Sequence, residues 1–256
     1  MIPALLSEAR TAVVSGASSG FGAAIARALG ALGWSVALGA RRLERLEEVA
    51  REVDAGGGSG LALALDVTDA GSIERFVARA TETLGPIDAV VSNAGVGAPG
   101  LLHEVEDRDL RLELDTNLLG PLRLARCALP GMLARRSGDL VFVTSLNAVL
   151  PRPFQVGYTA SKAGLEGAVR ALAMELEGSG VRASIVRPGP ARTEMGRGWD
   201  ADLVRRMLET WKRWGVLRHG GFLEPESVAR AVVHAVTAPR GAHLALIQVD
   251  PEAPVR

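Results

Sequence analysis

The chain has 256 residues, a length that suits one large α/β domain, and 48% of them are hydrophobic, enough to form a sizeable core. Its 29 basic and 29 acidic side chains balance, so its net charge gives no reason to expect nucleic acid or an anionic membrane as a partner. No apolar run approaches the roughly 18 residues of a membrane span, and residues 1–10 lack the pattern of a signal peptide, so a cytoplasmic protein is expected.

Short apolar runs alternate with longer helical patterns along the chain. The runs predicted as buried strands are 11–15, 34–40, 61–65, 87–92, 139–144, 181–187 and 244–249. The helical patterns cover 20–33, an amphipathic segment containing Leu43, Leu46 and Val49, and then 70–84, 107–135, 156–178 and 225–238. Continuous apolar strands separated by helices predict a parallel sheet covered on both faces. With right-handed crossovers, residues 1–256 are predicted to form a single-domain, doubly wound Rossmann fold with about seven parallel strands.

A glycine-rich segment joins the first predicted strand to the first predicted helix. It reads Ser15-Gly16-Ala17-Ser18-Ser19-Gly20-Phe21-Gly22. Glycines let the backbone turn tightly and approach a pyrophosphate, and the N-terminus of a helix offers free N–H groups and the positive end of a dipole. The segment therefore predicts a dinucleotide site.

The only tyrosine in the chain, Tyr158, lies four residues before Lys162, one of two lysines. This spacing places both side chains on one face of a helix. A phenol with a pKa near ~10 is a poor base at neutral pH, and a nearby ammonium is expected to lower that pKa. A tyrosine tuned in this way can give a proton to a carbonyl oxygen or take one from an alcohol. Ser145, at the end of the preceding strand, can hydrogen-bond the same oxygen.

These motifs, with the spacing Gly-x-x-x-Gly-x-Gly and in this order, resemble the short-chain dehydrogenase/reductase family over essentially the whole chain. The resemblance implies a catalytic set of Asn117, Ser145, Tyr158 and Lys162. In that family the asparagine supports a water-linked proton path through the lysine, which also binds the nicotinamide ribose. The resemblance further implies a nicotinamide cofactor held by Gly16, Ser18, Ser19, Gly20, Phe21, Gly22, Asp66, Val67, Asn93, Ala94, Gly95, Tyr158, Lys162, Pro188, Gly189 and Thr193.

The end of the second strand selects between the two nicotinamide cofactors. A carboxylate there would accept a hydrogen bond from the ribose 2′-OH and repel a 2′-phosphate. This sequence has Ala40 at that point, followed by Arg41 and Arg42. Because a guanidinium is well suited to bind phosphate, NADP(H) is predicted in preference to NAD(H), with Arg41 as the main contact and Arg42 as a helper. The alternative is that both arginines are solvated charges at a helix start.

The segment 190–222 breaks the alternation and holds three of the four tryptophans, which is typical of a binding loop or lid. We expect it to help form an apolar or aromatic substrate pocket. The residues predicted to contact substrate are Asn147, Phe154, Met195 and Trp199. Trp211 and Trp214 either pack the lid, lie at a subunit interface or contact substrate. Asn147 alternatively caps a turn, and His219 can reach the pocket.

Together the patterns predict an NADP(H)-dependent oxidoreductase that transfers a hydride between the nicotinamide and a small carbonyl or secondary alcohol. The alternatives are a nucleotide-sensing regulator without catalysis, and epimerisation or dehydration on the same scaffold. No metal is expected, because the four histidines lack ligand spacing. His234 is expected on a helix surface or in packing, and Cys127 as a small buried side chain. The segment Gln248-Val249-Asp250 replaces the family's usual Asp-Gly-Gly, which leaves a homodimer and a homotetramer open.

Overall fold

The computed structural model describes residues 10–217 and 219–253; residues 1–9, in which no signal peptide is predicted, and residue 218 lie outside the described part. The strands are β1 (Thr11–Ser15), β2 (Ser35–Ala40), β3 (Ser59–Ala64), β4 (Ile87–Ser92), β5 (Gly138–Val143), β6 (Val181–Pro188) and β7 (Leu246–Val249). The α-helices are α1 (Gly20–Gly30), α2 (Leu43–Ala55), α3 (Ala70–Leu84), α4 (Asp107–Leu114), α5 (Gly120–Arg135), α6 (Val156–Glu175), α7 (Ala201–Arg213) and α8 (Pro225–Thr237). Two short turns, π-helical η1 (Asp115–Leu119) and 3-10 η2 (Leu146–Ala148), complete the elements.

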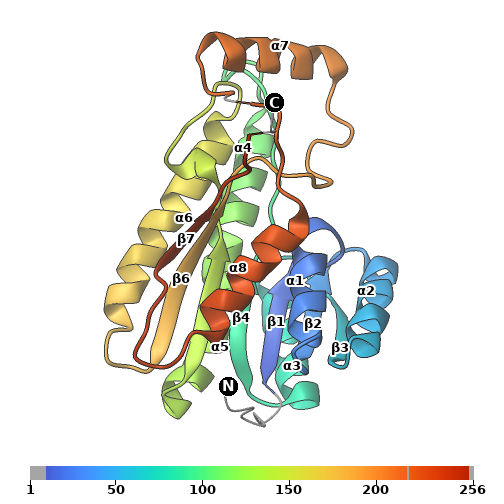
Figure 1. Ribbon diagram of the computed structural model, residues 1–256, viewed down its shortest axis with the longest axis vertical. Coiled ribbons are helices and arrows are strands. Elements are labelled where there is room, and N and C mark those ends of the chain that lie inside the picture. The colour runs from blue at the N-terminus through green and yellow to red at the C-terminus, as the bar shows by residue number, and fades with distance from the viewer. Residues whose placement is uncertain (1–9, 218, 254–256) are drawn as a thin grey trace.

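All seven strands form one sheet in the order β3-β2-β1-β4-β5-β6-β7, and every neighbouring pair is parallel. Helices α1, α2 and α8 cover one face, and α3, α5 and α6 cover the other (Figure 1). The predicted α/β fold, a doubly wound parallel sheet between two helical layers, is confirmed.

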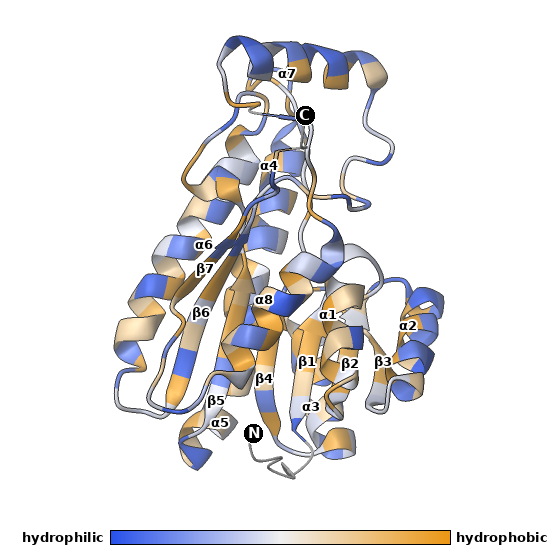
Figure 2. Cartoon of the chain, in the orientation of Figure 1, coloured by the Kyte–Doolittle hydropathy of each residue, from blue (hydrophilic) through white to orange (hydrophobic). Residues whose placement is uncertain are grey.

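The alternation of side chains along the buried strands explains why their sequences read as unbroken apolar runs. In β1, Ala12 and Val14 belong to the core on the α1 side, whereas Val13 belongs to the core on the α3 side. Figure 2 shows the strands as an apolar centre, with polar residues along the outer sides of the helices. Both faces of the sheet are therefore buried, as the parallel arrangement requires.

One predicted helix is interrupted. The pattern over 107–135 predicts a continuous helix, but the structure divides it into α4, η1 and α5. Pro121, at the start of α5, has no N–H to donate to the carbonyl of Asn117, so the wider π turn falls where the regular ladder loses a donor. The other boundaries shift by a few residues; β3, for example, ends at Ala64, two residues before Asp66.

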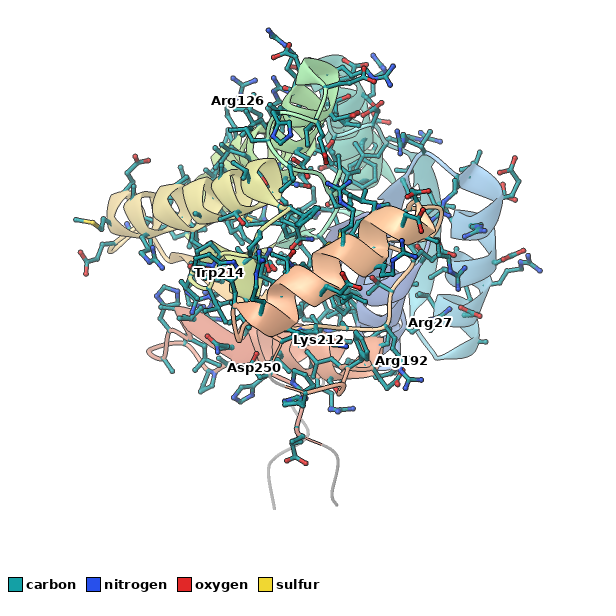
Figure 3. The ribbon with its side chains drawn as sticks, turned by 90° about the horizontal axis from the view of Figure 1, so that it is seen from above. Arg27, Arg126, Arg192, Lys212, Trp214 and Asp250 are labelled. Atoms are coloured by element: carbon teal, nitrogen blue, oxygen red, sulfur yellow. The ribbon has the colours of Figure 1, made fainter. Side chains whose placement is uncertain are left out.

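The strand order reverses at β1 and β4, and this switch point leaves a crevice at the carboxyl ends of the strands. Helix α7, within the segment 190–222, lies across this end of the molecule (Figure 1). Trp211 on its inner side packs with Phe154 and Met207, and its Nε1 donates to Pro153 O at 2.8 Å. Trp214 is 68% exposed at the C-terminal end of α7, where Figure 3 shows it from above. Among the described helices, none has the length and apolar character needed to cross a membrane.

Candidate active site

A cleft of about 890 Å³ opens at the carboxyl ends of the strands, between the glycine-rich loop and the N-terminal part of α6. The segment 190–222 supplies much of the remaining wall. The predicted cofactor residues that line this cleft are Gly16, Ser18, Ser19, Gly20, Phe21, Arg41, Arg42, Asp66, Val67, Asn93, Ala94, Gly95, Tyr158, Lys162, Pro188, Gly189 and Thr193. The predicted cofactor residues and the predicted catalytic residues Ser145, Tyr158 and Lys162 therefore line one continuous cleft.

The glycine-rich loop is held tightly against the end of β4. Gly16 has φ +67°, and a Cβ there would lie 2.8 Å from Ala94 Cα. The Ser15 hydroxyl accepts hydrogen bonds from the N–H groups of Asn93 and Ala94, at 3.0 and 3.1 Å. Asn93 Nδ2 donates in return to Ser15 O at 3.0 Å. Gly22, also predicted to bind cofactor, is buried beneath the loop. It packs so closely against Gly16 that a Cβ there would overlap Gly16 O.

Both arginines after β2 line the cleft, but they lie differently. Arg42 donates to the hydroxyls of Ser18 and Ser19, each at 2.9 Å, and to Glu194 Oε2 at 2.8 Å. Arg41 adds positive charge near Asp66. Hydrogen bonds from Thr68 are the main cause that lowers the pKa of the Asp66 carboxyl, and the charge of Arg41 contributes. The structure therefore ties Arg42 to the glycine-rich loop, while the role of Arg41 as main phosphate contact stays a prediction.

Tyr158, Lys162 and Ser145 line the other end of the cleft. The Lys162 Nζ lies 5.9 Å from the centre of the Tyr158 ring and donates to Val143 O at 3.0 Å. Ser145 Oγ accepts from Asn147 N at 3.2 Å, and Ser145 lines the same end of the cleft as Tyr158. The predicted serine, tyrosine and lysine are thus brought together by the end of β5 and the first turns of α6.

Burial dominates the ionisation of this group. It raises the pKa of the Tyr158 phenol, and the Ser145 side chain offsets only part of the effect. Burial also lowers the pKa of Lys162, to about 8. The sequence predicts that the ammonium lowers the tyrosine pKa, but in the free protein the shift is upward. The physical reason is that desolvation of the phenolate outweighs other effects, while the lysine amine points to the Val143 carbonyl.

Asn117 is completely buried behind the cleft, in the π turn η1. Its Oδ1 accepts from Val96 N at 2.8 Å, and its Nδ2 donates to Val96 O at 2.9 Å and to Ser161 Oγ at 3.1 Å. These hydrogen bonds connect the segment after β4 to α6 through Ser161, the residue before Lys162. Its predicted part in a proton path stays a prediction.

Three of the four predicted substrate residues, Asn147, Met195 and Trp199, line the cleft, as does His219. Asn147 also donates to Gln155 Oε1 at 2.6 Å, so it braces the loop before α6 while facing the cleft. Phe154 lies elsewhere: it has φ +69° and packs in the apolar cluster beneath α7. Its ring packs there with Met207 and Trp211.

Two charged side chains that line the cleft, Glu194 and Arg152, were not predicted from the sequence. Glu194, in the segment 190–222, forms ion pairs with Arg42, Arg45 and Arg197 at 2.7–3.0 Å. Hydrogen bonds from Arg42 and then Arg45 lower its pKa to about 2. Arg152, between η2 and α6, faces the cleft from the opposite side. Arg152 lies between Pro151 and Pro153, in the stretch bounded by the predicted substrate residues Asn147 and Phe154. This position was the sequence feature that could have identified it.

The side chains expected to be inert occupy ordinary positions. Cys127 on α5 is half-buried, and burial raises the pKa of its thiol. His234 is exposed on α8. Within residues 10–217 and 219–253, no three His, Cys, Asp or Glu side chains gather in a way that could hold a metal ion.

The comparisons with known proteins agree with this geometry. The family model for short chain dehydrogenase matches residues 10–203. The chain is 36% identical to glycine betaine reductase of Emericella nidulans over 94% of its own length, but spans only 19% of that longer protein. It is 33% identical to 2,3-dihydro-2,3-dihydroxybenzoate dehydrogenase of Bacillus subtilis, over 91% of each chain.

Among solved structures, an alcohol dehydrogenase from the archaeon Thermococcus sibiricus, complexed with 5-hydroxy-NADP, superposes with a TM-score of 0.81 and 30% identity. The match covers 94% of this chain and 96% of that one. The resemblance inferred from the sequence motifs is confirmed: the chain belongs to the short-chain dehydrogenase/reductase family of oxidoreductases.

Proposed function

We propose that this protein is an NADP(H)-dependent oxidoreductase that interconverts a carbonyl and a secondary alcohol, with Tyr158 as the acid and base. The observation that carries the proposal is the shared cleft. The phosphate-binding type of loop lies at one end, and the Ser145, Tyr158 and Lys162 side chains lie at the other. This arrangement fits a dinucleotide that reaches from the loop to a substrate oxygen beside the tyrosine.

The residues present fit the cofactor. Gly16 allows the backbone to approach closely where a Cβ would clash, and α1 begins directly after the loop with its free N–H groups. The two arginines after β2 provide positive charge where the family distinguishes its cofactors, and the solved archaeal relative is complexed with an NADP derivative. When bound, the nicotinamide would supply or accept the hydride. Lys162 would hold its ribose.

The chain's own residues account for the proton. The raised pKa of Tyr158 keeps the phenol protonated at neutral pH, so its O–H can donate to a carbonyl oxygen as negative charge develops there. The Ser145 hydroxyl, which lines the cleft with Tyr158, can orient the same oxygen.

The test is Tyr158→Phe assayed with NADPH and a panel of ketones, aldehydes and secondary alcohols. Turnover should fall by roughly a hundredfold or more, because the phenylalanine lacks the transferable proton. Binding of NADPH, measured by fluorescence, should stay near that of the wild type. Retained turnover in the variant would refute the assigned role of Tyr158.

The two other functions predicted as alternatives give different results. A nucleotide-sensing regulator would bind NADPH without oxidising it in the presence of any member of the panel. Epimerisation or dehydration would consume substrate without net change in the NADPH absorbance. The intact tyrosine–lysine pair facing the cleft supports the oxidoreductase over the regulator.

A homodimer or homotetramer and a cytoplasmic location remain predictions. The exposed leucines Leu119 and Leu133 lie on the segment of η1 and α5, where a second copy of the chain would bury them. Sedimentation equilibrium measures the assembly directly, and a monomer at micromolar concentration would contradict the prediction.

A further inference from the structure

Arg152, on the cleft wall, is a half-buried arginine without an ion pair in the described part of the chain. Arg152 forms no ion pair or side-chain hydrogen bond with residues 10–217 or 219–253, and its Nε is buried without a partner. The other deeply placed arginines differ. Arg187 pairs with Glu166 at 2.6 Å, and Arg182 pairs with Asp139 at 2.7 Å. Because a buried N–H donor is costly to leave without a hydrogen bond, the unpartnered Nε of Arg152 points to a ligand.

The orientation of Arg152 is fixed by its neighbours. Its guanidinium lies over the Trp211 ring, 4.9 Å from the ring centre. Trp211 is itself anchored by the bond from its Nε1 to Pro153 O, on the same loop. Stacking of this kind holds the plane of the guanidinium while leaving its edge available for a planar, bidentate partner. The result is a cation held in place before any ligand arrives.

The electrostatic surroundings place this cation at the reactive end of the cleft. Burial is the main cause that lowers the pKa of Arg152, whereas Tyr158 in its ionised form and the Asp250 carboxylate act in the opposite direction. The Asp250 carboxylate accepts from Gln248 Nε2 at 2.6 Å and forms no ion pair with Arg152. Arg41 and Arg42, which we assign to the cofactor phosphate, lie on a different segment, after β2.

We propose that the substrate carries a carboxylate, bound by Arg152, on an apolar or aromatic body that contacts the tryptophan-lined wall. This inference deepens the proposed function, because it names the substrate class of the same cleft. The carboxylate accepts hydrogen bonds from the guanidinium, including the buried Nε–H, while the substrate carbonyl lies beside Tyr158. A neutral analogue would leave the Arg152 charge unpaired and offer its buried Nε–H a weaker acceptor, so the site should prefer the acid.

Binding is tested first, without turnover. Benzoate and benzamide are titrated calorimetrically into NADP⁺-saturated protein, since they differ chiefly in charge. The wild type should bind benzoate roughly tenfold more tightly or better, as expected for a charge-assisted pair. The preference should disappear in Arg152→Met, which keeps an unbranched apolar stem but removes the guanidinium, and should persist in Arg205→Met. Arg205 is the matched control, because it lies exposed on α7 and pairs with Asp202.

Turnover is tested second, with 3- and 4-acetylbenzoate and their methyl esters. The ratio of kcat/KM for acid to ester should exceed about ten in the wild type and in Arg205→Met, and approach one in Arg152→Met. Equal binding of benzoate and benzamide by the wild type would overturn the inference. So would a preference that Arg152→Met leaves intact, or a loss that falls equally on acid and ester, which marks a structural role.

The two proposals fail in different ways. Arg152-dependent binding of benzoate with no reduction of any carbonyl would support the carboxylate site and overturn the oxidoreductase. Reduction of neutral ketones with no Arg152-dependent preference for acids would support the oxidoreductase and overturn the carboxylate site.

Discussion

Replacing Lys162 by methionine is expected to stabilise the free protein while it abolishes turnover. The side chain is 3% exposed and its amine has one hydrogen bond, to Val143 O at 3.0 Å, among the described residues. Burial lowers the pKa of the lysine from 10.5 to about 8. Methionine can fill the same narrow space without a charge, so the variant removes the cost of holding an ammonium there.

The size of the effect follows from the pKa. A shift from 10.5 to about 8 corresponds to about 3 kcal/mol by which folding disfavours the ammonium relative to the amine. Loss of the hydrogen bond to Val143 O offsets about 1 kcal/mol. At pH 7 the free energy of unfolding of the variant should therefore exceed that of the wild type by about 2 kcal/mol.

The sign of the pH dependence is also fixed. Below pH 8 both folded and unfolded states carry the charge, and the full penalty applies. Between pH 8 and 10.5 the unfolded chain binds more protons than the folded chain, so the stability of the wild type rises with pH. The advantage of the variant should shrink by about 2 kcal/mol from pH 7 to pH 10.

The assay is urea unfolding at pH 7, 8, 9 and 10, followed by tryptophan fluorescence at one protein concentration. Lys212→Met is the control, because Lys212 is the other lysine of the chain and is exposed on α7. Its difference from the wild type should stay constant across the same range. A difference between Lys162→Met and the wild type that is constant, or that grows with pH, would refute the reasoning.

Three further predictions concern the cofactor end, the packing of α6 and the pH profile. Arg41→Ala should weaken NADPH binding by roughly tenfold with little effect on NADH binding. Glu194→Gln, which removes the ion pair with Arg42, should tighten NADPH binding by up to roughly fivefold. Fluorescence titration measures both, and equal effects on the two cofactors would contradict the assignment. Gly157→Ala should lower the free energy of unfolding by about 1–3 kcal/mol, because a Cβ there overlaps the buried Glu113 carboxylate. Gly167→Ala is the control on the same helix, where the added Cβ meets open space, and it should raise the free energy of unfolding by up to about 1 kcal/mol in the same urea assay. For carbonyl reduction, kcat/KM should fall as pH rises through about 8, since Lys162 loses its charge there; a profile flat to pH 9.5 would contradict this.

The fold was predictable because the central strands β1, β2, β4, β5 and β6 are buried on both faces, and the edge strands β3 and β7 still read as short apolar runs. Continuous apolar runs separated by helical patterns admit few arrangements other than a doubly wound parallel sheet. The motif residues then fall at the carboxyl ends of β1, β4, β5 and β6, where such a sheet binds ligands. Local sequence was therefore sufficient to bring Ser15, Asn93, Ser145 and Pro188 to one edge.

Features that depend on contacts between distant segments were not predictable. The π turn η1 reflects a proline at the start of α5 and an asparagine bonded to Val96 and Ser161, none of which alters the helical periodicity. Phe154 has a positive φ, which sequence rarely reveals for a phenylalanine, and it packs with Met207 and Trp211 and does not line the cleft. Arg152 is unusual only because no acidic partner lies against it in the described residues, and a sequence does not show a missing partner.

The low pKa of Lys162 depends on how a neighbouring acid is used. Tyr158, Lys162 and Glu166 follow one another at intervals of four on the same face of α6, so the glutamate is placed to pair with the lysine. Instead, the buried Glu166 carboxylate binds Arg187 through both oxygens and accepts from the Thr144 hydroxyl. Because Glu166 is paired with Arg187, it does not stabilise the Lys162 ammonium. Desolvation then dominates and lowers the pKa of Lys162 to about 8. Lys162 therefore carries its charge at pH 7 and loses it as the pH rises through about 8.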